Sequence, residues 1–526
     1  MSSEPAATVG ADEAQAPSSP GLDEWPRPPR PSWAGRAVAA AVVLAALFVY
    51  TRYGTQARLL HDDAIFVYGG QQMADGVPPY VSIFDHKGPL STMLCGVGAW
   101  VARLAGLDEL TTIRRLFLLS ALGAVLGIFG AGRRLFGSTR AGLLAAAVFL
   151  AYSRFGFHAL GGPRPKTLVV GCEALALWAM ASRSWFWAGA CGALAGLTWQ
   201  PTAIFAFAAI GLAGADPSGK GRLANALRAT AGMVVPLAIV GGYFLAMGAF
   251  GAFFEGAVAF NLRYLASPTS VRLHLFKLAE AIYESNIGLG FTVALGLLAM
   301  PLAFLWRARR VGVGKALLRD PFACLFVTLP WPLAWSLADF QGYPDFFVFL
   351  PYAALGFAWI LDRAWNGIRL DLRAPEDTRR PDGAWLWVLS ALLAIGGATW
   401  VANYYRTAEL PAQRAEVAEL LASFPNENVV FLGAPDAMVL GERTNPTRYG
   451  FLMRGIDALI DDTHADGFPG WLDGLGEPDG VIVGRIVLRS IAPDHLATLE
   501  AWLERFVLDE DASDSWLVYR ASTEVR

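Results

Sequence analysis

Charged residues are scarce in this sequence. They make up 17% of its 526 residues, whereas a soluble globular domain carries about a quarter. The deficit falls in repeated apolar runs, each of about the length that crosses the hydrocarbon core of a bilayer. The chain is therefore predicted to be a polytopic integral membrane protein and not a soluble enzyme. Its net charge is −3, so no excess of positive charge indicates a nucleic-acid partner.

Cysteine is also scarce, and histidine numbers only six. The four cysteines all lie in apolar segments, none of them in a CxxC spacing: Cys95, Cys172, Cys191 and Cys324. This pattern predicts small core residues, neither disulfides nor metal ligands. No acidic cluster in the sequence demands a metal ion.

Long apolar runs are what the sequence has in abundance. They predict about eleven to thirteen membrane spans, with 185–213 forming one bent helix or two short ones. The runs are 37–51, 89–106, 116–131, 141–157, 167–182, 185–213, 230–250, 287–306, 321–338, 345–361 and 384–403. Arginines immediately precede the first run, which places the N-terminus in the cytoplasm by the positive-inside rule. Residues 1–33, rich in Pro and Ser, are predicted to be a disordered cytoplasmic tail.

Strict alternation of these spans conflicts with the positive-inside rule at one place. It puts Arg133, Arg134 and Arg140 on the outer side of the membrane. Either 89–106 does not cross the membrane, or these arginines serve an external anionic group, and the sequence leaves both alternatives open. The arginine-rich stretch 362–383 is predicted to be cytoplasmic, so the last span leads outward.

The predicted fold class is an all-α polytopic membrane bundle, residues 34–405, with a small C-terminal extracytoplasmic α/β domain, residues 408–526. In this tail, helical spacing predicts a helix over 412–423, and apolar runs predict strands at 428–434 and 479–488. A second helix over 492–506 and a closing strand at 515–520 follow. The tail has no glycine-rich phosphate loop, which favours a docking or lid module. The stretch 262–286 is predicted to lie as an amphipathic segment at the interface.

The loop 52–88 carries the chemistry, and its polar part reads HDDAIFVYGGQQMADGVPPYVSIFDHKGPL over 61–90. An acidic pair, Asp62 and Asp63, opens a predicted helix, and a second cluster, Asp85, His86 and Lys87, precedes the next apolar run. A helix, a turn at DGVPPY and a return segment bring the two clusters together. The structural alternative is that the acidic pair only complements the dipole of a solvated helix.

The order of these residues resembles the first external loop of the GT-C superfamily of integral membrane glycosyltransferases. The matching features are an acidic pair followed by an aromatic residue and Tyr, then A-x-G-x-x-P-Y, then F-D-x-K-x-P-L. Three further stretches resemble later segments of that superfamily: 255–265, 342–356 and 442–451. The resemblance implies an enzyme of the bacterial mannosyltransferase or aminoarabinose-transferase kind, multi-pass in the cytoplasmic membrane. It would move a monosaccharide from a polyprenyl-phosphate carrier to a glycan, lipid or protein acceptor.

Carried over to this sequence, the catalytic carboxylate falls on Asp62 or Asp63, of which Asp63 is preferred because Phe66 and Tyr68 follow it. The cationic position falls on Lys87. The sequence departs from one common form of the motif, two prolines after the lysine, by having Gly88 and Pro89. The candidate substrate-binding residues are Asp85, His86, Lys87, Tyr68, Tyr80, Arg164, Lys166, Arg263 and Tyr343. No cofactor is implied with certainty. Some members of the superfamily use a divalent metal ion, which stays an open alternative.

The chemistry explains these residue types. A carboxylate can take the proton of an attacking hydroxyl, and a cation can stabilise the departing phosphate. Two other function classes are considered. A transporter or lipid flippase would carry ionisable residues inside several spans and repeat symmetry, whereas here these residues concentrate in the loops. Glu173, within an apolar run, is a functional-site candidate by default. The third class is a membrane scaffold without catalysis.

Overall fold

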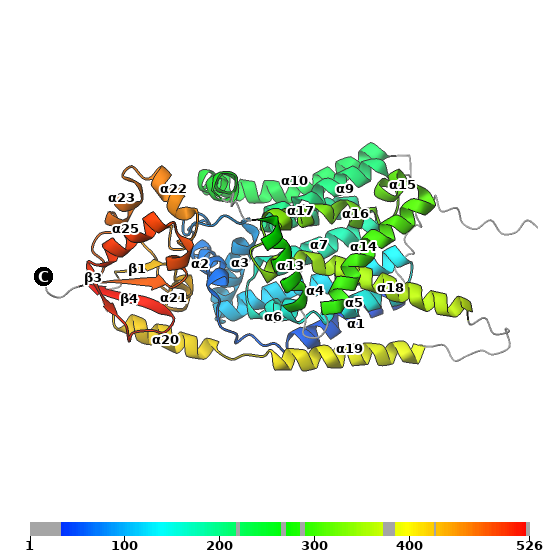
Figure 1. Ribbon diagram of the computed structural model, residues 1–526, viewed down its shortest axis with the longest axis horizontal. Helices are drawn as coiled ribbons and strands as arrows, with labels where there is room; N and C mark the ends of the chain where they lie inside the picture. Colours follow the sequence, from blue (N-terminus) through cyan, green and yellow to red (C-terminus); the bar gives the residue numbers. More distant parts are fainter. Residues whose placement is uncertain are drawn as a thin grey trace, which may run out of the picture.

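A computed structural model describes residues 33–216, 221–264, 270–284, 290–371, 384–424 and 428–521. The predicted N-terminal tail up to residue 32 and positions 372–383 of the arginine-rich stretch lie outside these ranges. Figure 1 shows a long bundle of helices with a small α/β unit at one end. The polytopic helical bundle and the C-terminal α/β unit are thereby confirmed.

Within the described residues, five stretches are by themselves long and apolar enough to cross a membrane. They are α1 (Trp33–Tyr50), α4 (Glu109–Phe136), α10 (Arg222–Ala246), α14 (Gly290–Val311) and Tyr343–Ala364, which joins η3 (Tyr343–Phe349) to α18 (Leu350–Asp371). This number is smaller than the predicted eleven to thirteen. Several predicted spans consist of shorter helices separated by breaks, so a count of apolar runs is not a count of long helices.

The breaks fall inside three predicted spans. Run 141–157 divides into α5 (Thr139–Leu150) and α6 (Ser153–Gly161), bent by 72°. Run 185–213 divides into α8 (Trp185–Thr198), η1 (Gln200–Ala203) and α9 (Ile204–Ala215), as two short helices. Run 321–338 divides into α16 (Ala323–Thr328) and α17 (Pro330–Ala338). Pro201 and Pro330 stand at the starts of η1 and α17, where the missing N–H of proline is tolerated.

Further helices belong to the bundle. They are α7 (Pro165–Ala181), α11 (Phe250–Phe254), η2 (Glu255–Phe260), α12 (Asn261–Arg263), α13 (Val271–Glu284), α15 (Val313–Leu318) and α19 (Ala384–Tyr404). Helix α13 falls within the predicted amphipathic segment and exposes Val271, Leu275 and Phe276.

The conflict over the arginines is resolved by α2 (His61–Ala74) and α3 (Leu90–Ala105). Both helices lie at the end of the bundle that faces the C-terminal unit (Figure 1). Directly after α3, the side chain of Asp108 caps α4 and pairs with Arg414 of the C-terminal unit at 2.6 Å. Because α3 has only 16 residues and packs against Gly69 and Gly70 of α2, the alternative that 89–106 does not cross the membrane is favoured. Helix α4 then carries Arg133 and Arg134 to the opposite end.

Basic residues gather at that opposite end. Arg134 donates to the carbonyl of Ala181 at the end of α7. Ion pairs close the helix ends there: Arg140 with Asp362, Arg183 with Asp216, and Arg307 with Asp320. The bundle therefore has a basic end and an end that faces the α/β unit.

The C-terminal unit is built on a four-stranded sheet of order β1-β2-β4-β3. Strand β1 (Val429–Leu432) pairs in parallel with β2 (Gly480–Gly484), and β4 (Trp516–Ala521) runs antiparallel to both β2 and β3 (Phe506–Asp509). Helices α20 (Leu410–Ala422), α21 (Pro435–Leu440), α22 (Ile456–Thr463), α23 (Gly467–Asp473), α24 (Val487–Ser490) and α25 (Pro493–Leu503) surround the sheet.

Two predicted elements of this unit are shorter than expected. The strand predicted over 479–488 ends at Gly484 because α24 follows it. The helix predicted over 492–506 ends at Leu503, since Phe506 begins β3 and pairs with Ala521.

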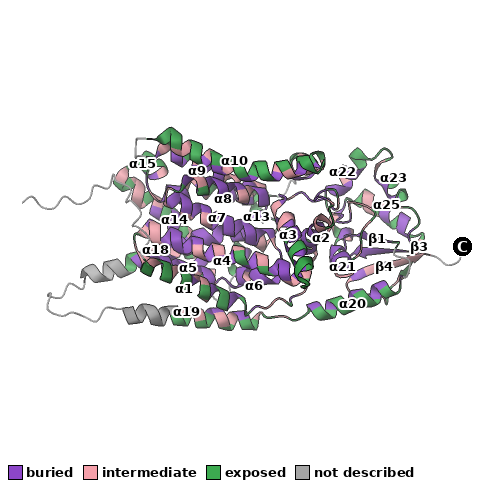
Figure 2. Cartoon of the chain, turned by 180° about the vertical axis from the view of Figure 1, so that it is seen from behind, coloured by how far each residue is buried: buried purple, intermediate pink, exposed green. Residues whose placement is uncertain are grey.

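The apolar core of the C-terminal unit continues into the bundle. One buried cluster joins Ile65 and Val67 of α2 to Val417 of α20 and Phe431 of β1. Figure 2 shows buried residues on both sides of this contact. Helix α2, which carries the acidic pair, is thus packed between the two parts of the molecule.

Candidate functional site

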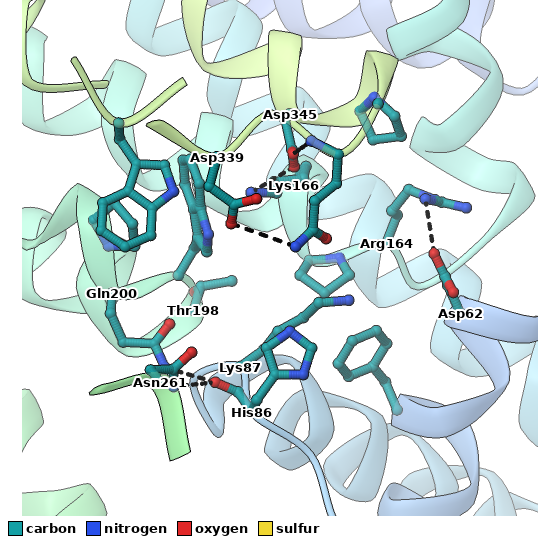
Figure 3. A pocket seen from close by; sticks show the side chains of 18 of the residues that line it. Asp62, His86, Lys87, Arg164, Lys166, Thr198, Gln200, Asn261, Asp339 and Asp345 are labelled. Carbon is teal, nitrogen blue, oxygen red and sulfur yellow. Dashed lines mark hydrogen bonds and ion pairs between the residues drawn. The ribbon is translucent and has the colours of Figure 1, made fainter. Parts of the chain in front are cut away.

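A pocket lined by many charged and polar side chains opens where α2, the return segment after it, the start of α7, η1 and the α17–η3 connection meet. Figure 3 shows side chains from all these elements around one space. The lining residues are Asp62, Asp63, Phe66, His86, Lys87, Arg164, Pro165, Lys166, Thr198, Trp199, Gln200, Pro201, Asn261, Trp335, Asp339, Gln341, Gly342, Pro344 and Asp345. The two polar clusters of the 61–90 segment therefore do come together.

The two acidic residues of α2 differ in their surroundings. The side chain of Asp63 is 2% exposed and pairs with Arg164 Nε at 3.1 Å, while that of Asp62 is 50% exposed and lies 3.7 Å from Arg164 Nη1. Gly162 closes over Asp63, because an added Cβ there would collide with the Asp63 carboxylate. Asp62 is thus the accessible carboxylate of the pair.

Charge and burial act in opposite directions on these carboxylates. Burial raises the pKa of Asp63, against the opposing effect of Arg164. Burial also acts to raise the pKa of Asp62, but Lys87 and Arg164 outweigh it, and the pKa falls below its ordinary value. Asp62 is therefore ionised at neutral pH and able to accept a proton.

Lys87 is held in place by a polar turn. The Asp85 carboxylate accepts hydrogen bonds from the backbone N–H groups of His86, at 2.8 Å, and Lys87, at 3.2 Å. The His86 carbonyl accepts from the amides of Gln200, at 2.9 Å, and Asn261, at 2.7 Å. Bonds from three elements thus fix the backbone on either side of His86, and Lys87 projects into the pocket from a rigid base (Figure 3).

Gly88 explains the departure from the two-proline form of the motif. A Cβ at this position would collide with the backbone carbonyl of Leu197 near the end of α8. The turn therefore packs directly against the α8 backbone, which leaves no room for a side chain at residue 88.

The three cations of the pocket are not equally engaged. Lys166 pairs with Asp345 at 3.0 Å and lies over the indole ring of Trp199, and Arg164 faces the two carboxylates of α2. Among the described residues of the pocket, Lys87 forms no ion pair. Its Nζ lies 5.2 Å from the centre of the Phe66 ring. Lys87 is thus the cation of this pocket most available to an added anion.

His86 lines the pocket in neutral form. Burial lowers its pKa to about 4, only partly opposed by Asp85. Between pH of about 6.5 and about 4 the unfolded chain binds a proton at this residue that the folded chain does not. Folding stability attributable to His86 is therefore present above this window and is lost as the pH falls through it, by about 3 kcal/mol in total.

The variant His86→Gln is expected to remove this contribution. Lowering the pH from about 7 to about 4.5 should then reduce its thermal unfolding temperature less than that of the wild type. Thermal unfolding in detergent at both pH values measures the difference. An equal decrease in both proteins would show that His86 does not titrate as described.

Two predicted substrate-binding tyrosines do not line the pocket. Tyr68 faces the C-terminal unit, where its hydroxyl accepts a hydrogen bond from the backbone N–H of Asn445. Tyr80 is buried and donates to the Lys87 carbonyl at 2.6 Å, so it supports the turn from behind. Neither tyrosine lines this pocket, and direct contact of either with substrate stays a prediction.

Three further predicted residues also lie outside the pocket lining. Asp85 is buried in the turn described above, and Arg263 is exposed on α12. Tyr343 directly precedes Pro344, which lines the pocket. The Tyr343 hydroxyl instead forms a hydrogen bond with His158 Nε2 at 2.7 Å. Their side chains support or flank the site and do not form its wall.

Several lining residues were absent from the predicted set. Gln200 and Asn261 hold the turn, and Asp339 and Asp345 come from the α17–η3 connection. The signal available in the sequence was the interruption of apolar runs at Pro201 and Pro344. Irregular backbone at membrane depth is tolerated where it is buried in protein or lines a cavity.

Glu173 lies away from the pocket. It is fully buried within α7, and neither carboxylate oxygen has a hydrogen-bond partner among the described residues. Its functional role stays a prediction. In the same ranges, no three His, Cys, Asp or Glu side chains are grouped so that they could hold a metal ion.

Comparison with known proteins gives matches in structure. No family model and no curated protein match the sequence. The structure is similar to that of ArnT from Cupriavidus metallidurans in the apo state, with 15% identity, a TM-score of 0.59, and coverage of 93% of this chain and 99% of that one. The chain has the GT-C fold.

Two other structures with this GT-C fold agree. ArnT bound to undecaprenyl phosphate matches with 16% identity and a TM-score of 0.58, over 94% of this chain and 99% of that one. An oligosaccharyltransferase from Archaeoglobus fulgidus, in complex with Zn and sulfate, matches with 13% identity and a TM-score of 0.50, over 92% of this chain and 73% of that one. At these identities the likeness establishes the GT-C fold, and the reaction is argued from the pocket.

Proposed function

We propose that the chain is a membrane glycosyltransferase that moves a monosaccharide from a polyprenyl-phosphate carrier to a hydroxyl of a glycan, lipid or protein acceptor. The observation that carries this proposal is the meeting of an accessible carboxylate, Asp62, and an available cation, Lys87, in one pocket. The bundle around them is suited to a carrier whose tail stays in the bilayer. One structure with the same fold holds undecaprenyl phosphate, which supports this carrier class.

The reaction is a single displacement. The acceptor oxygen forms a bond to the anomeric carbon while the bond from that carbon to the phosphate oxygen breaks, and the phosphate leaves with the electron pair. The acceptor proton goes to the Asp62 carboxylate, and Lys87, with Arg164 beside it, stabilises the charge on the leaving phosphate. Inversion at the anomeric carbon follows from this scheme.

Asp62 is proposed as the base in preference to Asp63. A base must come within hydrogen-bond reach of the hydroxyl that it deprotonates. Asp62 is open to the pocket, whereas Asp63 is covered by Gly162 and paired with Arg164. Asp63 then has the role of fixing the Arg164 guanidinium.

The proposed orientation follows from the basic end of the bundle. By the positive-inside rule that end lies in the cytoplasm, and the pocket and the C-terminal unit lie outside the cytoplasmic membrane. Single cysteines at Glu477 and Arg319 test this in intact cells with a membrane-impermeant maleimide. Labelling of Glu477→Cys alone is expected, and labelling of Arg319→Cys alone would reverse the orientation.

The activity itself is tested with purified protein in lipid and a panel of polyprenyl-phosphate sugars. Release of polyprenyl phosphate, dependent on an added acceptor extract, is the expected result. Failure to consume any carrier of the panel, by protein that binds polyprenyl phosphate, would contradict the proposal.

A further inference from the structure

The segment that leads into α2 is held from two sides. From the bundle, the buried guanidinium of Arg114 donates to the carbonyls of Thr55 and Ala57. From the C-terminal unit, the backbone N–H of Leu410 donates to the carbonyl of Gln56 at 2.9 Å. The direction in which α2 starts is therefore set jointly by the two parts of the molecule.

Gln413 of the C-terminal unit forms hydrogen bonds with the backbone of Leu59, the residue three positions before Asp62. Gln413 of α20 accepts a hydrogen bond from the Leu59 N–H at 2.8 Å and donates to the Leu59 carbonyl at 3.1 Å. Its amide nitrogen also donates to Asp436 at 3.3 Å, and the side chain is 1% exposed. An amide that engages the N–H and the C=O of one residue fixes the two peptide groups on either side of that residue.

The fixed backbone of Leu59 leads directly to the acidic pair, Asp62 and Asp63. Leu60, the next residue, has extended backbone angles, and its carbonyl accepts from the N–H groups of Asp63 and Ala64 as the first bonds of α2. Leu60 alone separates Leu59 from His61, the first residue of α2. A movement at Leu59 is thus passed to the carboxylates at the start of α2.

We infer that Gln413 is a positioning residue for Asp62, acting through the backbone of Leu59, and that the C-terminal unit thereby belongs to the catalytic apparatus. The inference rests on the proposed function. A displacement of about 1 Å in a catalytic group can reduce the rate by about 10²-fold. Without Gln413, the Leu59 N–H and C=O also lose their partners in a buried place, which favours a shift of the segment.

The test compares two neighbouring residues of α20. Gln413→Leu removes the bonds to Leu59, and kcat is expected to fall by about 10- to 100-fold while KM for the carrier sugar changes by less than about twofold. The matched control is Arg414→Ala, which removes a 2.6 Å ion pair to Asp108 at the start of α4 and leaves the bonds between Gln413 and Leu59 in place. The control is expected to keep the wild-type kcat.

A second pair of variants separates positioning from loss of folding. Gln413→Glu keeps the acceptor for the Leu59 N–H but sets a second carboxylate against Asp436, so a reduced kcat is expected. Adding Asp436→Asn removes that repulsion and is expected to restore part of the lost kcat. No restoration, with both proteins folded by thermal unfolding, would contradict the inference.

The outcomes also distinguish the two levels of the proposal. A wild-type kcat for Gln413→Leu, together with an inactive Asp62→Asn, would overturn the positioning role and leave the proposed function standing. A wild-type protein that binds the carrier but does not consume it would overturn the proposed function itself.

Discussion

Replacing Asp62 by Asn is expected to lower the turnover of a polyprenyl-phosphate sugar by about 10²- to 10⁴-fold, the range typical of general-base removal. Asparagine keeps the shape of the side chain but cannot accept the acceptor proton. Because the Asp62 side chain is 50% exposed and lies 3.7 Å from Arg164 Nη1, the fold should be unaffected. Release of polyprenyl phosphate, measured at saturating carrier, gives the rate.

Two further variants, Asp75→Asn and Asp63→Asn, show whether a loss of turnover in Asp62→Asn is specific to Asp62. Asp75→Asn, at the other end of α2 and outside the pocket, is expected to retain activity. Asp63→Asn is expected to lower thermal stability as well as turnover, because removing one partner of a buried ion pair costs about 3–5 kcal/mol. If Asp62→Asn turned over the carrier at the wild-type rate while Asp63→Asn did not, the base would be Asp63.

Replacing Lys87 by Met is the second large effect. Its ammonium is the cation most available to a phosphate, and the neutral, similarly long methionine removes the charge alone. Turnover is expected to fall by about 10²- to 10³-fold, as when one stabilising donor is removed from a leaving or developing anion. Affinity for polyprenyl phosphate itself should also fall, as measured by the shift of the unfolding temperature on adding the lipid.

Two controls accompany Lys87→Met: a conservative substitution at the same position and the same substitution at a distant lysine. Lys87→Arg keeps the charge and is expected to retain part of the activity, although the larger guanidinium fits the fixed turn less well. Lys315→Met, at the basic end of the bundle, should behave as the wild type. Undiminished lipid affinity in Lys87→Met would show that the phosphate is held elsewhere.

The meeting of the two polar clusters was predictable because it is a local property. Asp62 and Lys87 stand at the two ends of a helix, turn and return segment, so their approach is visible in one short stretch of sequence, although Gln200 and Asn261 then fix the turn. The choice between Asp62 and Asp63 was not predictable, since both precede the same aromatic residues. It depends on Gly162 and Arg164, which approach from a different part of the sequence.

The pocket residues contributed by η1 and by η3 could not be predicted from the sequence either. Gln200 and Asp345 reach the pocket because helices break at η1 and η3, and hydropathy gives the break only as a proline inside an apolar run. Hydropathy likewise could not tell that α3 packs along α2, because an apolar run of 16 residues has the same composition whether or not it crosses a membrane. The fold class was predictable from composition, and the number and direction of crossings were not.

The most direct test of the account is where the carrier phosphate binds. A polyprenyl phosphate with a photoreactive group beside its phosphate can be crosslinked to the protein in lipid and the labelled peptides identified. Labelling within 61–90 and 335–345, abolished by excess unmodified lipid, is the predicted result. Specific labelling confined to the basic end, around Arg133 or Arg307, would contradict it.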